Sequence, residues 1–359
     1  MRPVVIDSVV SRALSVPTAE PFVIATGEVH ATRSVLAKVV LEDLGDGRRS
    51  QGLGEGSCFP PVTREDQPEA LAGLERAVPL LVGSKVTSLL QLQSLLDGVL
   101  GDLPVARAAL EVACLDALAR LDAAPLYQWL EGDDGAASPL ETDVTIPLLP
   151  PERMAALAAE WWARGFRALK VKVGKHLEDD LKALGAMVKA TPQARFRPDA
   201  NGGLSVEEAL AWLAAARTLG AHVDCFEQPC ATRAELEEVA RRTDVPVIAD
   251  ESVKQASDLE GLSVDGVNLK IAKSGSLLRA RDVGLLARTR GLKVMVGGMV
   301  ETRLGMTAAA HLAASLGGAD FADLDTAFLL TSDPFHGGYV ATGAQLALPD
   351  APGLGISFG

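Results

Sequence analysis

Cysteine and histidine are scarce in this chain of 359 residues, which contains four cysteines and five histidines. The four cysteines show no C-x-x-C spacing; they are Cys58, Cys114, Cys225 and Cys230. This pattern argues against a structural zinc site and against a disulfide framework, since both need closely spaced ligands or thiol pairs. We therefore expect a reducing compartment, namely the cytoplasm.

Long hydrophobic runs and an excess of positive charge are also missing. No apolar run reaches the length of a membrane span, and the first 19 residues, interrupted by Asp7 and Arg12, do not resemble a signal peptide. The 34 basic and 47 acidic residues give a formal net charge of -13, which disfavours nucleic acid and anionic membranes as partners. Since 48% of the residues are hydrophobic, the chain can bury a large core. A small molecule is the expected partner, and a homo-oligomer stays open.

The first 130 residues are expected to form an α+β domain. Short apolar stretches in residues 4–44 predict antiparallel strands, with a break at Asp7 and Ser8. Residues 52–56, which alternate glycine with other residues, and the following residues 59–61 are expected to be a flexible loop. A glycine-based nucleotide motif is a weaker alternative, because no crossover helix follows directly. Helical periodicity dominates residues 69–130.

After residue 139 the chain alternates predicted strands and helices at intervals of roughly 20 to 28 residues, the length of one βα unit. The eight predicted strands end near Thr145, Lys172, Asp199, Glu227, Asp250, Lys270, Gly297 and Asp323. Eight such units predict a parallel α/β barrel, although periodicity leaves a doubly wound sheet open. Residues 331–359 contain glycines and prolines instead of a long helix, so this segment is expected to leave the barrel and pack on the first domain.

Three of the predicted strands end in acids, at Asp199, Glu227 and Asp250. In a parallel barrel these ends lie on one face, where three carboxylates repel one another unless a cation joins them. Oxygen ligands without His or Cys suit magnesium better than zinc, so the three acids are the expected metal ligands. A helix N-cap would explain any one of them, but three on consecutive strands favour the metal. The neighbouring Asn201 and Glu251 are expected to support the ligands or to cap helices.

Lysines end the strands on both sides of the acids. Lys170 and Lys172 alternate in one strand and so share a face, and Lys270 ends the strand beyond the acids. This arrangement places Lys172 and Lys270 across the metal from each other, which suits proton transfer at both faces of one carbon. A lysine base needs a pKa lowered towards neutrality, and Lys170 and a divalent cation would both lower the pKa of Lys172. Lys273 is interpreted as a solvated lysine or a salt-bridge partner.

Taken together, these segments resemble the enolase superfamily, specifically its muconate lactonizing enzyme subgroup. The matching segments appear in family order along nearly the whole chain: Lys170-Val171-Lys172, Asp199-Ala200-Asn201, Glu227-Gln228-Pro229, Asp250-Glu251-Ser252, Asn268-Leu269-Lys270 and Gly297-Gly298-Met299-Val300-Glu301-Thr302. The resemblance implies one Mg2+ per active site, which binds a substrate carboxylate and stabilises the enediolate formed when the adjacent α-proton leaves.

The resemblance also implies a modified (β/α) TIM-type barrel with an α+β N-terminal capping domain. The expected division is a capping domain over residues 1–130, a barrel over residues 131–330, and a segment over residues 331–359 that returns to the cap. Cap loops around residues 22–30 and 54–63 are implied to close over the substrate and set its specificity.

Within the subgroup, Asp323-Leu324-Asp325 is similar to the D-x-D motif of dipeptide epimerases. Both acids alternate onto one face, where they could bind the ammonium of a dipeptide; a helix N-cap plus a surface acid is the alternative. The remaining expected substrate contacts are Thr145, Lys170, Gly298 and Val300. The resemblance thus implies a Mg2+-dependent dipeptide epimerase in which Lys172 and Lys270 are the two bases and Lys170 adds positive charge near the carboxylate.

Other activities share this arrangement in the family: N-acylamino acid racemisation, o-succinylbenzoate synthesis and muconate cycloisomerisation. A lyase or cycloisomerase has no need of ammonium-binding acids, and a non-catalytic binding protein has no need of three acids and two opposed lysines. Epimerases acting on Ala-Glu carry an arginine in the first cap loop, whereas residues 22–28 of this chain contain none. An acidic second residue is therefore disfavoured, and hydrophobic or cationic dipeptides both stay open.

Overall fold

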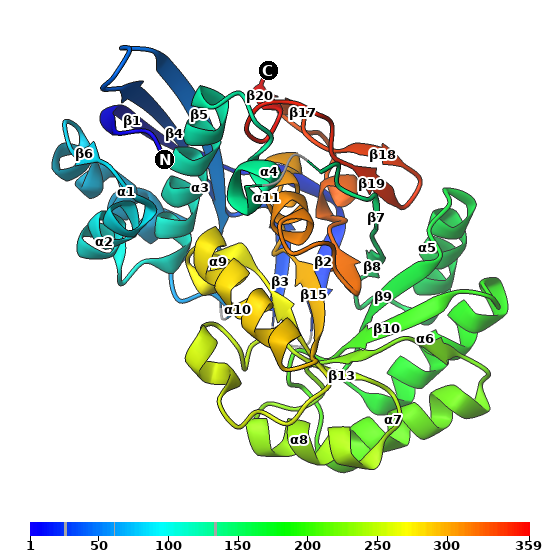
Figure 1. Cartoon of the computed structure of the whole chain (residues 1–359). Helices are drawn as coiled ribbons and strands as arrows, with labels where there is room; N and C mark the ends of the chain where they lie inside the picture. The colour runs from blue at the N-terminus through cyan, green and yellow to red at the C-terminus, as the bar shows by residue number, and fades with distance from the viewer. Residues whose placement is uncertain (25–26, 61, 133–134) are drawn as a thin grey trace.

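An antiparallel sheet in the order β5-β4-β1-β6 forms the first part of the fold (Figure 1). The computed structural model describes residues 1–24, 27–60, 62–132 and 135–359. The sheet contains β1 (Val4–Leu14), β4 (Ser34–Asp43), β5 (Arg49–Ser57) and β6 (Lys85–Val86), and a separate hairpin contains β2 (Pro17–Ile24) and β3 (Gly27–Ala31).

Strand β1 is continuous, so the break predicted at Asp7 and Ser8 is wrong. Ile6 pairs with Leu41 and Ser8 pairs with Val40, which leaves Asp7 as an extra residue opposite β4. One extra residue of this kind is a β-bulge, which bends a strand without ending it.

Four helices complete this part, and they confirm the helical periodicity of residues 69–130: α1 (Gln67–Leu81), α2 (Leu89–Leu100), α3 (Pro104–Leu121) and α4 (Leu126–Glu131). We call β1 to β6 and α1 to α4 the cap. Helix α3 is buried at nearly every position. It contacts β4 and β5 of the cap sheet as well as helices that belong to the barrel.

Strand β5 shows that the loop predicted at residues 52–56 is wrong. The glycines of this segment alternate along the strand on the face that packs on α3. A Cβ atom at Gly52 would lie 2.0 Å from the carbonyl oxygen of Ala113, and one at Gly54 would lie 2.0 Å from that of Ala109. Glycine is needed because the strand backbone touches the helix backbone directly. Pro61, the last residue of the predicted loop, lies outside the described residues.

Eight parallel strands in chain order form the barrel: β8 (Val144–Ile146), β9 (Ala168–Lys172), β10 (Arg195–Asp199), β12 (Phe226–Glu227), β13 (Val247–Ala249), β14 (Gly266–Leu269), β15 (Lys293–Gly297) and β16 (Phe321–Asp323). A short strand, β11 (His222–Val223), also pairs with β10. Thr142, just before β8, bridges to Ala322 in β16, and the N–H of Asp143 donates to the carbonyl of Ala322 at 3.0 Å. The last strand of the sheet therefore lies beside the segment that leads into the first strand, which confirms the barrel and excludes the doubly wound alternative.

Helices surround most of the barrel: α5 (Pro151–Ala163), α6 (Leu177–Ala190), α7 (Val206–Thr218), α8 (Arg233–Arg242), α9 (Ile271–Ser274), α10 (Leu277–Thr289) and α11 (Arg303–Ala314). Single turns of 3-10 helix, η1 (Ala256–Leu259) and η2 (Thr326–Leu329), follow β13 and β16. The last βα unit therefore has no regular helix, in agreement with the modified barrel.

The C-terminal segment crosses from the barrel to the cap, as expected, and both chain ends lie on the cap side (Figure 1). β17 (Phe335–Gly337) pairs with β20 (Ile356–Phe358), while β18 (Val340–Thr342) and β19 (Gln345–Ala347) form a small sheet with β7 (Leu140–Glu141). The N–H of Leu354 donates to the Asp116 carboxylate of α3 at 2.7 Å. Boundaries at residues 130 and 330 stay a prediction.

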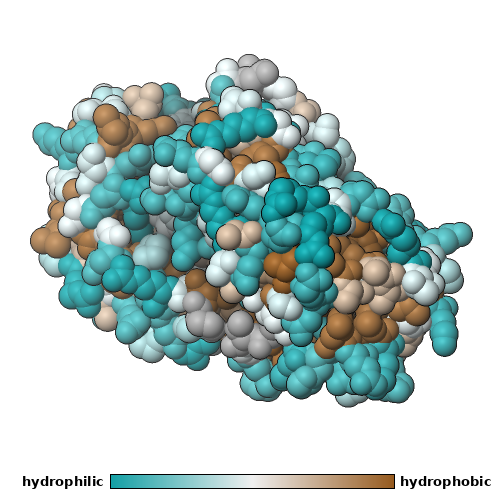
Figure 2. Space-filling view, turned by 90° about the horizontal axis from the view of Figure 1, so that it is seen from below, coloured by the Kyte–Doolittle hydropathy of each residue, from teal (hydrophilic) through white to brown (hydrophobic). Residues whose placement is uncertain are grey.

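Hydrophobic side chains fill two main cores, one inside the barrel and its helices and one in the cap. Seen from below, the surface is mostly hydrophilic with separate hydrophobic patches (Figure 2). Within the described ranges, no helix combines the length and the apolar character needed to cross a membrane.

Candidate active site

Three carboxylates meet at the carboxyl end of the barrel. Asp199 ends β10, Glu227 ends β12, and Asp250 follows β13 directly. Asp199 and Glu227 are partners in the parallel ladder, so their side chains leave the sheet side by side. Each of the three residues is at most 1% exposed. The structure therefore brings the three expected metal ligands into one buried region.

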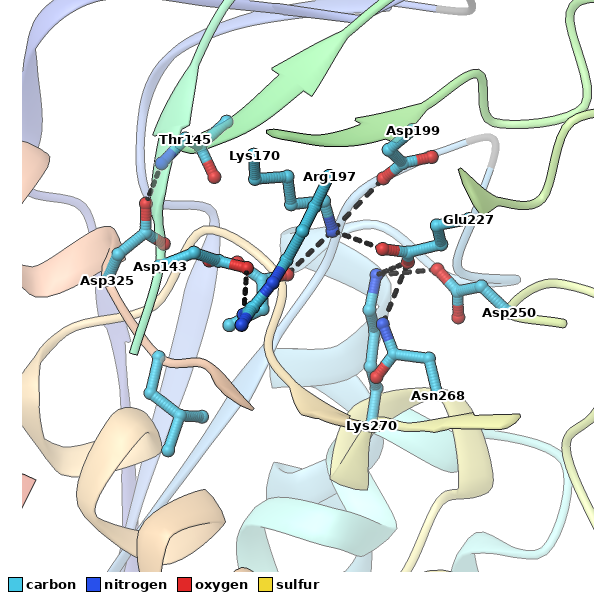
Figure 3. A network of polar contacts seen from close by, with 12 residues as sticks. Asp143, Thr145, Lys170, Arg197, Asp199, Glu227, Asp250, Asn268, Lys270 and Asp325 are labelled. Atoms are coloured by element: carbon cyan, nitrogen blue, oxygen red, sulfur yellow. Dashed lines mark hydrogen bonds and ion pairs between the residues drawn. The ribbon is translucent and has the colours of Figure 1, made fainter. Parts of the chain in front are cut away.

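The ammonium of Lys170 lies among these acids (Figure 3). Its Nζ is 3.0 Å from Asp199 Oδ2, 2.8 Å from Glu227 Oε2 and 2.7 Å from Asp323 Oδ2. A buried ammonium requires compensating charge, and the carboxylates supply it. This explains why β9 directs a lysine into the barrel.

Lys172 and Lys270 project from opposite walls of the barrel. Lys172, on β9, places Nζ 2.6 Å from Asp199 Oδ2. Lys270 follows β14 and places Nζ 2.6 Å from Asp250 Oδ2. Strands β10, β12 and β13 separate β9 from β14, which is half of the way around a barrel of eight strands. The acids thus lie between the two lysines, as the sequence predicts.

Two more polar side chains, Lys273 and Asn268, belong to the same cluster. Lys273 Nζ lies 2.7 Å from Asp250 Oδ1 and donates to the backbone carbonyl of Asn268 at 2.7 Å. Asn268 Nδ2 donates to Glu227 Oε1 at 2.8 Å (Figure 3). A solvated Lys273 is wrong, because its side chain is only 1% exposed. Alternation could have predicted Asn268, which lies in β14 two positions before Lys270, so that both side chains point to the same side.

Asn201 and Glu251 form a pair beside the carboxylates. The Nδ2 of Asn201 donates to Glu251 Oε1 at 3.1 Å, and its backbone N–H donates to Asp199 Oδ1 at 2.9 Å. Lys172 Nζ donates to Asn201 Oδ1 at 3.4 Å. Asn201 therefore orients both the carboxylate of Asp199 and the ammonium of Lys172.

Burial and ion pairing shift the pKa values of this cluster in opposite directions. Burial raises the pKa of Asp250, but the ammonium groups of Lys270 and Lys273 outweigh it and hold that pKa well below its usual range. Burial lowers the pKa of Lys270, but the charges of Asp250 and Glu227 raise it above its usual value. Burial together with the charge of Asp199 raises the pKa of Glu227 to about 7. In this arrangement Lys270 has the opposite of the lowered pKa that a general base requires.

The donor set at the strand ends fits a hard divalent cation. Asp199, Glu227 and Asp250 offer oxygen atoms only, the ligand type that Mg2+ prefers. In this structure lysine nitrogens form ion pairs with those oxygens. Among the described residues, no group of three His, Cys, Asp or Glu side chains is already arranged around a metal position. A cation at the carboxylates would take over the charge compensation that Lys170 and Lys270 now provide.

Asp323 and Asp325 lie in different surroundings. Asp323 ends β16 and faces Lys170, whereas Asp325 accepts the backbone N–H of Thr145 from β8 through its Oδ2. The other oxygen of Asp325, Oδ1, is buried without a hydrogen-bond partner among the described residues. Burial and the charge of Asp323 raise the pKa of Asp325 to about 7. Asp325 occupies the N-cap position of η2, but its side chain makes no capping hydrogen bond, and both acids are buried. The alternative of a helix N-cap plus a surface acid is therefore wrong.

Arg197 of β10 is a further buried charge of this cluster, and it was not among the residues predicted from the sequence. Its Nη1 lies 2.9 Å from Asp143 Oδ2 (Figure 3). The same nitrogen donates to the backbone carbonyl of Ala322 at 3.2 Å. Burial and the charge of Asp323 raise the pKa of Asp143 well above its usual value. An arginine inside a buried strand was the available signal, since it requires an acid nearby.

A cavity of about 30 Å³ lies between the cap and these residues. Phe22, Phe59 and Val62 of the cap line one side, and the barrel side is lined by Thr145, Lys170, Asn201, Glu251, Lys270, Gly298, Met299, Val300, Asp323 and Thr326. The expected contacts Thr145, Lys170, Gly298, Val300 and Asp323 thus line the cavity, whereas Asp325 is not among the lining residues. Residues 25, 26 and 61 of the two cap loops lie outside the described residues.

Two family models match the chain. Residues 7–131 match the N-terminal domain of the mandelate racemase / muconate lactonizing enzyme family, and residues 153–358 match the Enolase C-terminal domain-like model. The chain belongs to this family of the enolase superfamily. The resemblance seen in the sequence is therefore confirmed, and the barrel with its cap is the fold of the family.

Characterised family members resemble the chain over nearly its full length. The aromatic dipeptide epimerase of Herpetosiphon aurantiacus is 37% identical, with 99% of both chains covered. The L-Ala-D/L-Glu epimerase of Bacillus subtilis is 34% identical, with 96% of this chain and 94% of the relative covered. The structure of a dipeptide epimerase from Enterococcus faecalis, complexed with Mg and L-Leu-L-Tyr, superposes with a TM-score of 0.88 at 32% identity and covers 99% of this chain and 100% of that one.

Proposed function

We propose that this family member is a Mg2+-dependent dipeptide epimerase that inverts the configuration at the α-carbon of the C-terminal residue. The observation that carries the proposal is the position of Lys172 and Lys270 on opposite walls of the barrel, with three buried carboxylates between them. The names of the relatives in Herpetosiphon aurantiacus and Bacillus subtilis support the substrate class. The Mg and dipeptide in the Enterococcus faecalis structure support both the cofactor and the substrate.

We assign the cation to Asp199, Glu227 and Asp250. When bound, Mg2+ would hold the substrate carboxylate and stabilise the negative charge that develops as the α-proton leaves. Asn201 and Glu251 would keep the ligands in place, because Asn201 already bonds to Asp199 and to Glu251. Groups behind the ligands commonly orient them in this way.

Lys172 and Lys270 would then act as the two bases. One lysine removes the α-proton from its face of the substrate, and the other returns a proton on the opposite face. The charge of Asp250 raises the pKa of Lys270 in this structure, so neutralisation of Asp250 would lower that pKa towards the range of a base. Lys170 would stay protonated and place positive charge near the substrate carboxylate.

The two acids at the end of β16 and the apolar cap side of the cavity support a dipeptide with a hydrophobic second residue. Asp323 and Asp325 would bind the N-terminal ammonium, with Thr145 beside them. Gly298 and Val300 would border the substrate. A hydrophobic side chain would lie against the part of the cavity lined by three apolar cap residues, namely Phe22, Phe59 and Val62.

The test is incubation of a dipeptide panel in D2O with Mg2+. Hydrophobic dipeptides should exchange the α-proton of the C-terminal residue and change configuration there, and L-Ala-L-Glu should react more slowly. Lys270→Ala should abolish epimerisation, and turnover at the wild-type rate would refute the two-base proposal. Faster racemisation of N-acylamino acids than of dipeptides would favour the N-acylamino acid racemase alternative instead.

We also propose a cytoplasmic location. All four cysteines are unpaired and buried, which is consistent with a reducing compartment.

A further inference from the structure

Two buried carboxylates of the cap form hydrogen bonds with barrel segments next to the active site. Glu111 lies in α3 and Glu55 lies in β5, and they are 0% and 5% exposed. Neither residue lines the cavity. Each accepts hydrogen bonds from the start of a barrel helix that follows a strand of the site.

Glu111 holds the start of α10. The hydroxyl of Ser276, the N-cap of this helix, donates to the Glu111 carboxylate at 2.7 and 2.8 Å, and the N–H of Leu278 donates to it at 3.2 Å. The same hydroxyl accepts the N–H of Arg279 at 3.0 Å. A carboxylate at a helix N-terminus is stabilised by the free N–H groups and the helix dipole, so this contact fixes where α10 begins.

A second contact from α3 holds the residues between Lys270 and α10. Arg107, one turn before Glu111, donates from Nη1 to the backbone carbonyl of Gly275 at 2.8 Å. Gly275 has a φ of 68°, and a Cβ atom there would lie 2.8 Å from Pro104 at the start of α3. Because α9 begins directly after Lys270, α3 anchors the short segment that carries this lysine.

Glu55 repeats the arrangement one βα unit later. Its carboxylate accepts the hydroxyl of Thr302, the N-cap of α11, and the N–H of Gly305 at 3.0 Å. Ser57, two residues along β5 on the same face, donates from its hydroxyl to the carbonyl of Val300 at 2.9 Å. Strand β5 therefore contacts both the middle of the loop that borders the cavity and the start of the helix that follows it.

We propose that Glu111 and Glu55 are positioning residues of the reaction: Glu111 fixes Lys270 from behind, and Glu55 fixes the loop that carries Gly298 and Val300. The inference rests on the proposed function. Misplacement of a reacting group by about 1 Å can cost on the order of 100-fold in rate. Lys172 is oriented by two barrel residues, Asp199 and Asn201. Loss of the Glu111 contact should therefore slow proton transfer only on the face of the substrate that Lys270 serves.

The test measures α-proton exchange in D2O separately for L-Ala-L-Phe and L-Ala-D-Phe. Lys270→Ala identifies the epimer whose proton faces Lys270, since exchange of that epimer is lost. Glu111→Gln should slow α-proton exchange of that epimer at least about tenfold more than exchange of the other. Ser276→Ala should shift the ratio of the two exchange rates in the same direction. Glu55→Gln should raise KM for both epimers and leave their ratio unchanged.

Asp116→Asn is the matched control. Asp116 is also a buried acid of α3, but it accepts the N–H groups of Leu53 and Leu354 and so holds segments away from Lys270. Asp116→Asn should therefore slow α-proton exchange of both epimers by the same factor. An unchanged ratio in Glu111→Gln and Ser276→Ala would overturn the inference and leave the epimerase proposal intact, and Ser276→Ala decides if Glu111→Gln does not fold. A wild-type enzyme that exchanges neither epimer would refute the proposed function and this inference with it.

Discussion

Replacement of Gly54 by alanine should destabilise the protein, although backbone entropy predicts the opposite. Alanine in a strand interior is favoured over glycine by about 0.5–1 kcal/mol, because glycine loses more conformational freedom on folding. At this position the new Cβ atom would lie 2.0 Å from the carbonyl oxygen of Ala109 and 2.7 Å from the amide nitrogen of Ala113. Both are backbone atoms of α3, so β5 and α3 would have to separate. Overpacking costs about 1–3 kcal/mol, and we expect a net loss of about 1–2 kcal/mol.

Gly98→Ala provides the control for this prediction. Gly98 lies inside α2, and a Cβ atom there would meet no atom within 4 Å. The higher helix propensity of alanine should stabilise this variant by about 1 kcal/mol. The urea midpoint should therefore fall in Gly54→Ala and rise in Gly98→Ala. A midpoint for Gly54→Ala at or above that of the wild type would refute the close packing of β5 on α3.

Two further predictions concern buried charge. Burial lowers the pKa of His311 to about 3, so the unfolded chain binds a proton before the folded protein does, and stability should fall by about 1.4 kcal/mol per pH unit below about 6.5. Urea unfolding across this pH range should show that the free energy of unfolding depends less on pH in His311→Gln than in the wild type. The same pH dependence in both proteins would contradict a neutral buried imidazole. Lys170→Met leaves three buried carboxylates without their shared cation and should cost about 3–5 kcal/mol of stability without magnesium. Thermal unfolding with Mg2+ and with EDTA should show a smaller loss in Mg2+; equal losses would argue against a cation at these carboxylates.

The candidate site could be predicted from the sequence because its charged residues occupy strand ends. Once eight βα units are recognised, the parallel barrel alone brings Asp199, Glu227 and Asp250 to one face, whatever the loops do. Alternation likewise directs Lys170 and Lys172 to the same side. Lys273 was harder to assign, because a lysine in the first turn after a strand looks the same in sequence whether it is solvated or buried.

The cap could be predicted only in outline, since its details depend on contacts between distant segments. The glycines of β5 suggest a loop by composition, and they are explained only by the backbone of α3, which follows much later in the chain. Glu111 cannot be told in sequence from Asp116, the other acid of this mostly apolar helix, because its partner Ser276 belongs to the barrel. Asp7 suggests the end of a strand, and only the register with β4 shows a bulge.

The paired contacts of Glu55 with Thr302 and of Glu111 with Ser276 have a consequence for recombination between members of the family. A crossover placed in the linker between cap and barrel would separate each acid from the hydroxyl that it binds. A chimera assembled in this way would begin α10 and α11 beside a foreign cap. The smallest exchangeable unit is therefore the cap together with these two helix starts, and chimeras that move them as one block should keep more activity than those that move the cap alone.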